Sequence, residues 1–278
     1  MSIRYHQQIL PNGLTVIAEE NPSAHTAAVG FFVRAGARDE QAQYMGVSHF
    51  LEHMMFKGTA RRSADDVNRE FDEIGANYNA FTSQEMTVYY AQVLPEHLAR
   101  ATDLLGDMMR PALRQNDFDM EKNVILEEIS MYDDRPADRL QDVLLEKYFG
   151  SHSLGHRVLG FKETVSALSS QQMREYFEQR YSPDNMVVSL TGRLAFDEVV
   201  RQIEQLTAAW KPSGVKREYI APAPNAIVES MRQANVTRHY TAMICPGPSA
   251  QDESRYAARI LADVLGDSDG SRLYWALI

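Results

Sequence analysis

Apolar residues recur along the chain with two different periods, and the first of these predicts β-strands. Leu14–Ala18 and Ala27–Arg34 are short, apolar and partly β-branched, and a turn-favouring Asn-Pro pair at 21–22 separates them. We expect these two segments to pair as neighbouring strands. Further strands are expected where the same composition returns, at Asn77–Thr82, Met86–Leu94 and Asn185–Thr191.

The second period is that of an amphipathic helix. Ser48–Phe56 contains too much Leu, Met, His and Glu for a strand, and a helix beginning at Ser63, with a capping box to Asp66, ends at Gly75. Longer helical patterns cover Pro95–Met109, Asp117–Tyr132, Ala137–Phe149, Ser170–Arg180 and Phe196–Trp210. Strands separated by runs of helices predict an α+β fold, with helices packed on one face of a mainly antiparallel sheet.

A change in composition after residue 210 predicts a domain boundary. Residues 211–225, KPSGVKREYIAPAPN, have three prolines and little periodicity, which is typical of a linker. We expect a first domain at 1–210, this linker, and an incomplete second domain of similar fold at 226–278. The chain ends inside an apolar helical run without a stop signal, so we expect it to be C-terminally truncated.

The composition is that of an ordinary globular protein. Of the 278 residues, 44% are hydrophobic and 24% are charged, which argues against disorder and fibrous repeats. The formal net charge of −10 opposes binding to nucleic acid and anionic membranes, so neither is expected as a partner. With neither a leader-like segment nor a membrane-spanning apolar run in view, and with one cysteine, Cys245, we expect a cytoplasmic protein.

The segment His49-Phe50-Leu51-Glu52-His53 carries the clearest candidate chemistry. On an α-helix, residues four apart are offset by only ~40°, so the two imidazoles reach toward one point, as the ligands of a metal ion do. Zinc accepts imidazole nitrogens, and its catalytic sites have three protein ligands and a water. Glu52 can take a proton from that water. The spacing alone also fits a helix with two surface or core histidines.

A third ligand is expected from the helix at Asp117–Tyr132. Glu121 and Glu128 are seven residues apart and therefore within ~20° on one helical face, whereas Glu127 is rotated away from it. We prefer Glu128 as the ligand and expect Glu121 to orient the site or its histidines. A solvated acidic face is the alternative.

H-x-x-E-H is the inverted zincin signature. Here it appears as HFLEHMMFKGT, residues 49–59, ahead of the helix with Glu121 and Glu128, and it closely resembles the pitrilysin/insulinase family of zinc metallopeptidases. The likeness is greatest to mitochondrial-processing-peptidase-type and bacterial processing-protease members. Further motifs follow in the family's order: LPNGLTVI (10–17), NAFTSQEMTVYY (79–90), LGHRVLGFKETV (154–165), YSPDNMVVSLTG (181–192) and GSRLYWAL (270–277).

The resemblance implies a role for each matching residue. His49, His53 and Glu128 would hold one zinc ion per chain, Glu52 would be the general base, and Glu121 matches the family's assisting glutamate.

The same resemblance implies a substrate-binding strand at Asn79-Ala80-Phe81-Thr82. This stretch matches the edge strand on which such peptidases bind an extended peptide, and an unpaired strand edge does offer backbone N–H and C=O groups to a peptide. An ordinary paired strand is the alternative.

We therefore expect a zinc metalloendopeptidase that hydrolyses extended peptides or presequence-like segments, with residues 1–210 as its catalytic domain. The resemblance also implies pairing into a clam-like chamber, as a homodimer or a heterodimer. The alternative is a non-catalytic family member that serves as a peptide-binding or partner subunit. The intact set of His49, Glu52, His53 and Glu128 disfavours that alternative.

Overall fold

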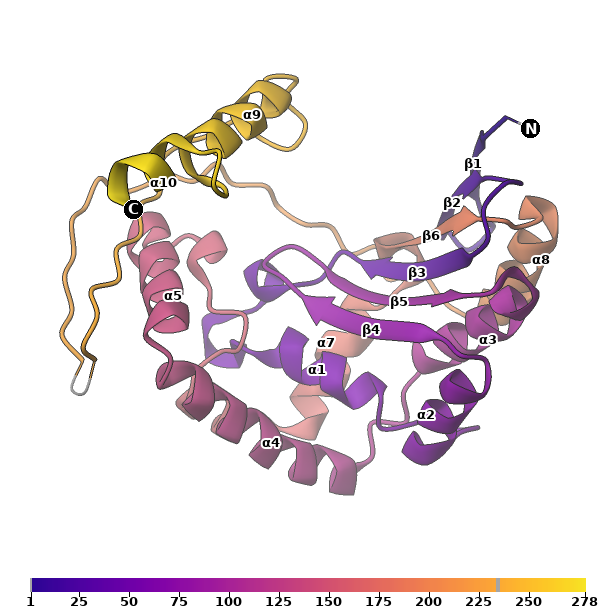
Figure 1. Ribbon diagram of the computed structural model, residues 1–278. Helices are drawn as coiled ribbons and strands as arrows, with labels where there is room; N and C mark the ends of the chain where they lie inside the picture. The colour runs from indigo at the N-terminus through magenta and orange to yellow at the C-terminus, as the bar shows by residue number, and fades with distance from the viewer. Residues whose placement is uncertain (1, 234–235) are drawn as a thin grey trace. The chain divides into compact units, whose positions relative to one another are not determined.

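A six-stranded sheet forms the centre of the first of two units, Met1–Tyr240 and Thr241–Ile278, in a computed structural model that describes residues 2–233 and 236–278. The strand order is β1-β2-β6-β3-β5-β4 (Figure 1). The strands are β1 (Arg4–Ile9), β2 (Thr15–Glu20), β3 (Ala27–Val33), β4 (Asn77–Thr82), β5 (Thr87–Val93) and β6 (Met186–Gly192). Only β2 and β6 run parallel, and the other neighbouring pairs are antiparallel. The predicted α+β fold is confirmed.

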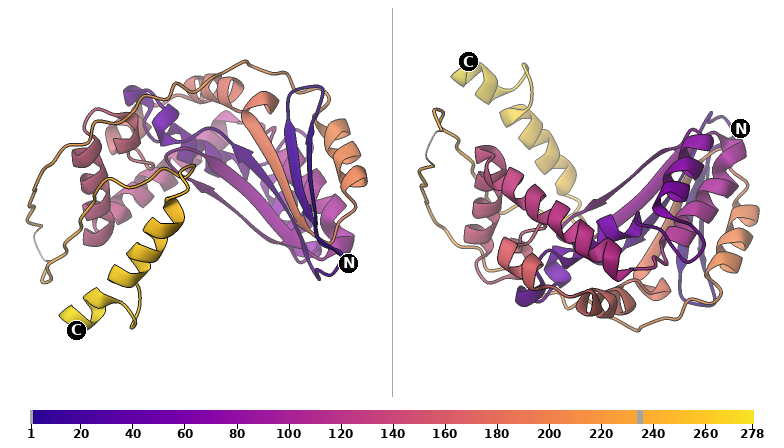
Figure 2. Two further views of the ribbon diagram at one scale, coloured as in Figure 1. Left: turned by 90° about the horizontal axis from the view of Figure 1, so that it is seen from above. Right: turned by 90° about the horizontal axis from the view of Figure 1, so that it is seen from below.

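Helices cover one face of this sheet, as Figure 1 and the view from below in Figure 2 show. The helices of the first unit are α1 (Val47–Met55), α2 (Ala64–Glu73), α3 (Leu98–Met108), α4 (Gln115–Asp133), α5 (Pro136–Phe149), α6 (Lys162–Ala167), α7 (Ser170–Arg180) and α8 (Phe196–Thr207). α1 contacts β4 and β5, and α3 contacts β3 and β5. The capping box expected at the start of α2 is present, because Ser63 Oγ accepts from the Asp66 N–H at 3.1 Å.

The expected pairing of the first two apolar strands is wrong. β6 lies between β2 and β3, so that Val188 stands opposite Val16 on one side and Phe31 on the other. All three side chains are fully buried. An apolar strand buries most surface in the middle of a sheet, and the local turn at residues 21–22 does not determine which strand takes that place.

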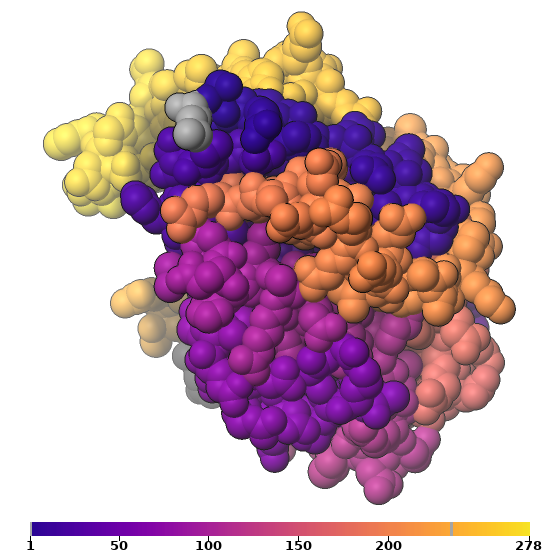
Figure 3. Space-filling model, turned by 90° about the vertical axis from the view of Figure 1, so that its right-hand side faces the viewer, coloured from indigo at the N-terminus to yellow at the C-terminus, as the bar shows by residue number. Residues whose placement is uncertain are grey.

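β1 is a strand that the hydrophobic pattern does not predict. It pairs with β2 at the edge of the sheet and is exposed at five of its six positions, so it has no apolar alternation. Its position is stabilised by His6, whose ring stacks on Phe196 of α8 with 4.4 Å between centroids. Figure 3 shows α8, in orange, beside the indigo N-terminal strands.

The contact between α1 and α4 positions the candidate site. Phe50 of α1 stacks on Phe118 of α4 with ring centroids 4.7 Å apart, and both side chains are fully buried. Alternate residues of β3, including Val29 and Val33, belong to the same hydrophobic core. The two helices are therefore locked to each other by packing that belongs to the core.

The second unit contains α9 (Arg255–Gly266) and α10 (Arg272–Leu277). The described residues between 211 and 254 contain neither helix nor strand. The domain boundaries expected at 210 and 225 stay predictions. In the part of the chain that the structure describes, no helix combines the length and the hydropathy needed to cross a bilayer.

The stacked pair predicts a large loss of stability in Phe118→Ala. Removing a buried phenylalanine leaves a cavity and should lower the free energy of unfolding by about 3–5 kcal/mol. Met120→Ala, on the same helix at a position that is 63% exposed, is the control and should change it by less than about 0.5 kcal/mol. Urea unfolding followed by circular dichroism measures both. Equal losses in the two variants would contradict this account of the α1–α4 contact.

Candidate metal centre

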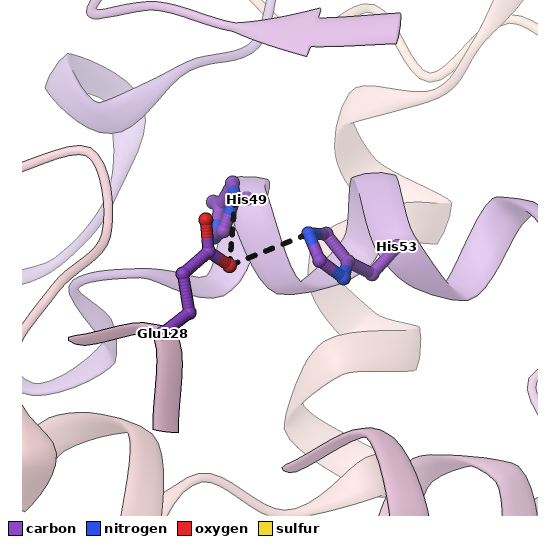
Figure 4. A group of neighbouring side chains, drawn as sticks. All are labelled: His49, His53 and Glu128. Atoms are coloured by element: carbon purple, nitrogen blue, oxygen red, sulfur yellow. Dashed lines mark ion pairs between the residues drawn. The ribbon is translucent and has the colours of Figure 1, made fainter. Parts of the chain in front are cut away.

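α1 presents His49 and His53 on successive turns, with 4.7 Å between the centroids of their rings. The Nε2 atoms of His49 and His53 lie 3.7 and 3.6 Å from Oε2 of Glu128, which projects from α4. Figure 4 shows this carboxylate directed at both imidazoles. One ligand atom from each residue lies within 4.8 Å of the others, so the three side chains could hold a metal ion.

The environment of His49 keeps its imidazole neutral. Burial, reinforced by the charge of His53, lowers the pKa of His49 to about 3. A neutral imidazole retains the lone pair that a metal ligand needs. For His53, burial acts to lower the pKa, but the hydrogen bond and charges of nearby carboxylates, Glu121 first, raise it overall.

Glu121 orients His53. Its Oε1 accepts a hydrogen bond from His53 Nδ1 at 2.9 Å, and its Oε2 pairs with Lys57 Nζ at 2.5 Å. A proton on Nδ1 leaves Nε2 free to face Glu128, as a metal-binding histidine requires. Although burial acts to raise it, the pKa of Glu121 is lowered by His53 and Lys57. Sequence reasoning missed Lys57, which stands four residues after His53, in the turn that follows α1.

The three candidate glutamates of α4 differ in burial and in position relative to the histidines, as their spacing predicts. Glu128 is partly buried beside the two histidines and Glu121 is buried beside His53, whereas Glu127 is exposed and lies outside the group of side chains that could hold a metal ion. Burial raises the pKa of Glu128, with His53 acting to lower it and Glu121 to raise it. Negative charge beside the two imidazoles favours a cation at the site.

Glu52 is held by the strand that lies over α1. Thr82 Oγ1, at the end of β4, donates a hydrogen bond to Glu52 Oε2 at 2.5 Å. Burial raises the pKa of Glu52, and the Thr82 hydroxyl acts against this shift. A carboxylate with a raised pKa accepts protons more readily near neutral pH. Thr82, expected only as part of a substrate strand, therefore also contacts the candidate base Glu52.

The four residues of the expected substrate strand lie on β4, which is an edge of the sheet and pairs only with β5. Asn79 and Phe81 are exposed, while Ala80 and Thr82 are partly buried. The N–H of Ala80 donates to Oδ1 of Asn79 at 2.8 Å. This backbone donor is thus satisfied by a neighbouring side chain outside the sheet ladder.

The sequence of this chain is similar to those of known peptidases. The model of the insulinase family, peptidase family M16, matches residues 15–162, and that of the peptidase M16 inactive domain matches residues 167–278. Proteins named uncharacterized zinc proteases from Bacillus subtilis and Streptomyces coelicolor are each 37% identical over 95% of this chain. The beta subunit of the mitochondrial-processing peptidase of Blastocladiella emersonii is 31% identical over 94% of it.

The chain spans 64%, 60% and 56% of the length of these three relatives. The crystal structure of a protease from Helicobacter pylori superposes with a TM-score of 0.85 at 20% identity, covering 99% of this chain and 68% of that one, which shows a shared fold. The model of the insulinase family matches more than half of this chain, and the matched part includes His49 and His53. The chain therefore belongs to the insulinase family of peptidases, family M16.

Proposed function

We propose that this chain carries the zinc site of a metalloendopeptidase of the pitrilysin type, which hydrolyses extended peptides or presequence-like segments. The observation that carries the proposal is the convergence of His49, His53 and Glu128, with Glu52 one residue before the second histidine. The names of the two bacterial relatives support zinc as the metal.

The donor set of the site fits zinc. Two imidazoles and one carboxylate are a ligand set of catalytic zinc sites, which keep a further position open. His49 is neutral and Glu121 holds Nδ1 of His53, so Nε2 of each ring is available to a metal. When bound, zinc would lower the pKa of a coordinated water and polarise the scissile carbonyl.

Glu52 would move the proton. Thr82 engages Oε2 of Glu52, which leaves Oε1 to accept a proton from the attacking water. The same carboxyl group can then return that proton to the departing amine, as a general acid–base residue does. Its raised pKa brings the two protonation states closer in free energy near neutral pH.

β4 would hold the peptide. An extended substrate added beside this edge strand would take over the N–H of Ala80 from the Asn79 side chain. Backbone pairing of this kind is indifferent to most substrate side chains, which suits the hydrolysis of varied extended segments. Thr82 lies at the end of the same strand, so the peptide would be placed next to Glu52.

Pairing with another chain is a further part of the proposal. One relative is named as a subunit of a processing peptidase, which supports a dimer with a second copy or with a different chain. A purified protein that holds no zinc would instead favour the non-catalytic partner subunit.

Glu52→Gln should keep the metal and lose hydrolysis. The amide cannot accept the proton of the attacking water, and general acid–base groups contribute about 10²–10⁴-fold to rate. Cleavage of a quenched peptide, with metal content measured on the same sample, tests this. Hydrolysis at the parent rate would rule out the proposed role of Glu52.

Glu128→Ala should lose zinc, whereas Glu127→Ala should not. The first change removes a ligand and should weaken zinc binding by more than the roughly 10–100-fold that loss of an outer partner costs. The second removes an exposed neighbour of the same charge on the same helix. Competition with a zinc chelator measures both, and strong metal loss in Glu127→Ala would reverse the ligand assignment.

Ala80→Pro should raise KM while zinc affinity stays unchanged. Proline removes an N–H that the sheet ladder does not use, and one lost backbone hydrogen bond corresponds to about a 10-fold change in affinity. Peptide hydrolysis kinetics and chelator competition provide the two readouts. An unaltered KM would exclude the outer edge of β4 as the binding strand.

A further inference from the structure

The first turn of α1 is buried and needs partners for its backbone N–H groups. A helix N-terminus leaves its first N–H groups without acceptors inside the helix. The N-cap residue, Gly46, has no side chain to supply one, and Ser48 is fully buried. Only glycine fits at position 46, because its φ is +96° and a Cβ there would lie 2.6 Å from the carbonyl oxygen of Leu159. The cap must therefore come from elsewhere in the chain.

Glu40 supplies this cap. Its Oε2 accepts a hydrogen bond from the N–H of Gly46 at 2.8 Å, and its Oε1 accepts one from the N–H of Ser48 at 2.7 Å. The residue is only 5% exposed. Burial raises the pKa of Glu40 to about 8, while the hydrogen bonds from Ser48 and Gly46 act to lower it. Both oxygens thus face the positive end of the helix dipole, where negative charge is favoured.

Neighbouring contacts hold both sides of the cap in place. Ser48 Oγ hydrogen-bonds the hydroxyl of Tyr176 on α7 at 2.7 Å. Asp39, next to Glu40, accepts a hydrogen bond from Arg217 Nε at 2.8 Å and pairs with Arg180. These contacts therefore fix both the loop that carries Glu40 and the first turn of α1, which Glu40 caps.

His49 depends on this turn more than His53 does. The ring of His53 is oriented by Glu121, but Nδ1 of His49 is buried and has no hydrogen-bond partner among residues 2–233 and 236–278. Metal-binding histidines usually donate their second ring N–H to a group that fixes the ring. Without one, the position of His49 is set by the backbone that carries it, and the preceding residue, Ser48, is the one that Glu40 holds.

We propose that Glu40 is a positioning residue of the metal centre, which caps the first turn of α1 and so holds His49 with its Nε2 toward Glu128. This role rests on the proposed function, since it presumes that the centre binds zinc. It also assigns to a residue nine positions before the first histidine a task that the H-x-x-E-H spacing does not reveal.

Glu40→Gln tests the role. The substitution keeps the shape of the side chain but turns an NH₂ group toward one of the two backbone N–H groups. Thr102→Val is the matched control, because it also removes a buried polar contact, the bond to the Leu98 carbonyl on α3. The 278-residue chain is titrated with zinc against a chelator, at a pH above the Glu40 pKa, and the visible absorption of the Co²⁺ form is recorded.

We expect Glu40→Gln to weaken zinc binding about 10–100-fold and to alter the Co²⁺ spectrum. Thr102→Val should lose stability while its zinc affinity stays within about twofold of the parent and its Co²⁺ spectrum is unaltered. The spectrum reports ligand geometry, which a general loss of stability does not change. Zinc affinity and a Co²⁺ spectrum in Glu40→Gln that match the parent would overturn the role of Glu40.

Two further outcomes are informative. If Glu40→Gln does not fold, Glu40→Asp decides: a carboxylate one methylene shorter reaches at most one of the two N–H groups, so zinc affinity should fall, and parent affinity would overturn the role. If the parent itself binds no zinc, the proposed function fails together with this inference. If the parent binds zinc and the Glu40 variants bind it equally well, this inference fails and the proposed function stands.

Discussion

Phe50 and Phe118 stack inside the contact between α1 and α4, and the whole centre depends on that contact. The two histidines come from α1, and the carboxylates that face them come from α4. The shortest of these separations along the chain, from His53 to Glu121, is 68 residues. Because both rings are fully buried, any shift of α4 along α1 would open a cavity in the core. The separation of Glu128 from the imidazoles is therefore set by core packing and not by the site alone.

A concentration of carboxylates around two imidazoles gives this centre its electrostatic character. Burial raises the pKa values of Glu52 and Glu128, whereas the partners of Glu121 keep its pKa low despite burial. Lys57 offsets one of these charges, and a divalent cation would offset others. Burial and the charge of His53 keep His49 neutral, so its ring retains the lone pair that a metal ligand needs. Burial thus moves the pKa values of the candidate ligands His49 and Glu128 and of Glu52 in the direction that favours their neutral forms.

The parts of the site that follow from helical geometry could be predicted from the sequence. A spacing of four puts His49 and His53 on one face, and a spacing of seven does the same for Glu121 and Glu128 while turning Glu127 outward. The capping box at Ser63 and Asp66 is equally local. These features depend on residues within two turns of one another, where chain geometry leaves few alternatives. The zinc-peptidase resemblance rested on the same motifs, and the family match confirms it.

By itself, then, the sequence determined the fold class, the family, and which side chains on each helix face the same way. Tertiary structure alone decided which strand separates β2 from β3, that the polar segment Arg4–Ile9 becomes an edge strand, and that Thr82 reaches Glu52. It also brought Glu40 to the buried start of α1. Each of these contacts is chosen by burial and by the need to satisfy backbone groups across the whole unit, and the hydrophobic period of one segment does not reveal which distant segment it will contact.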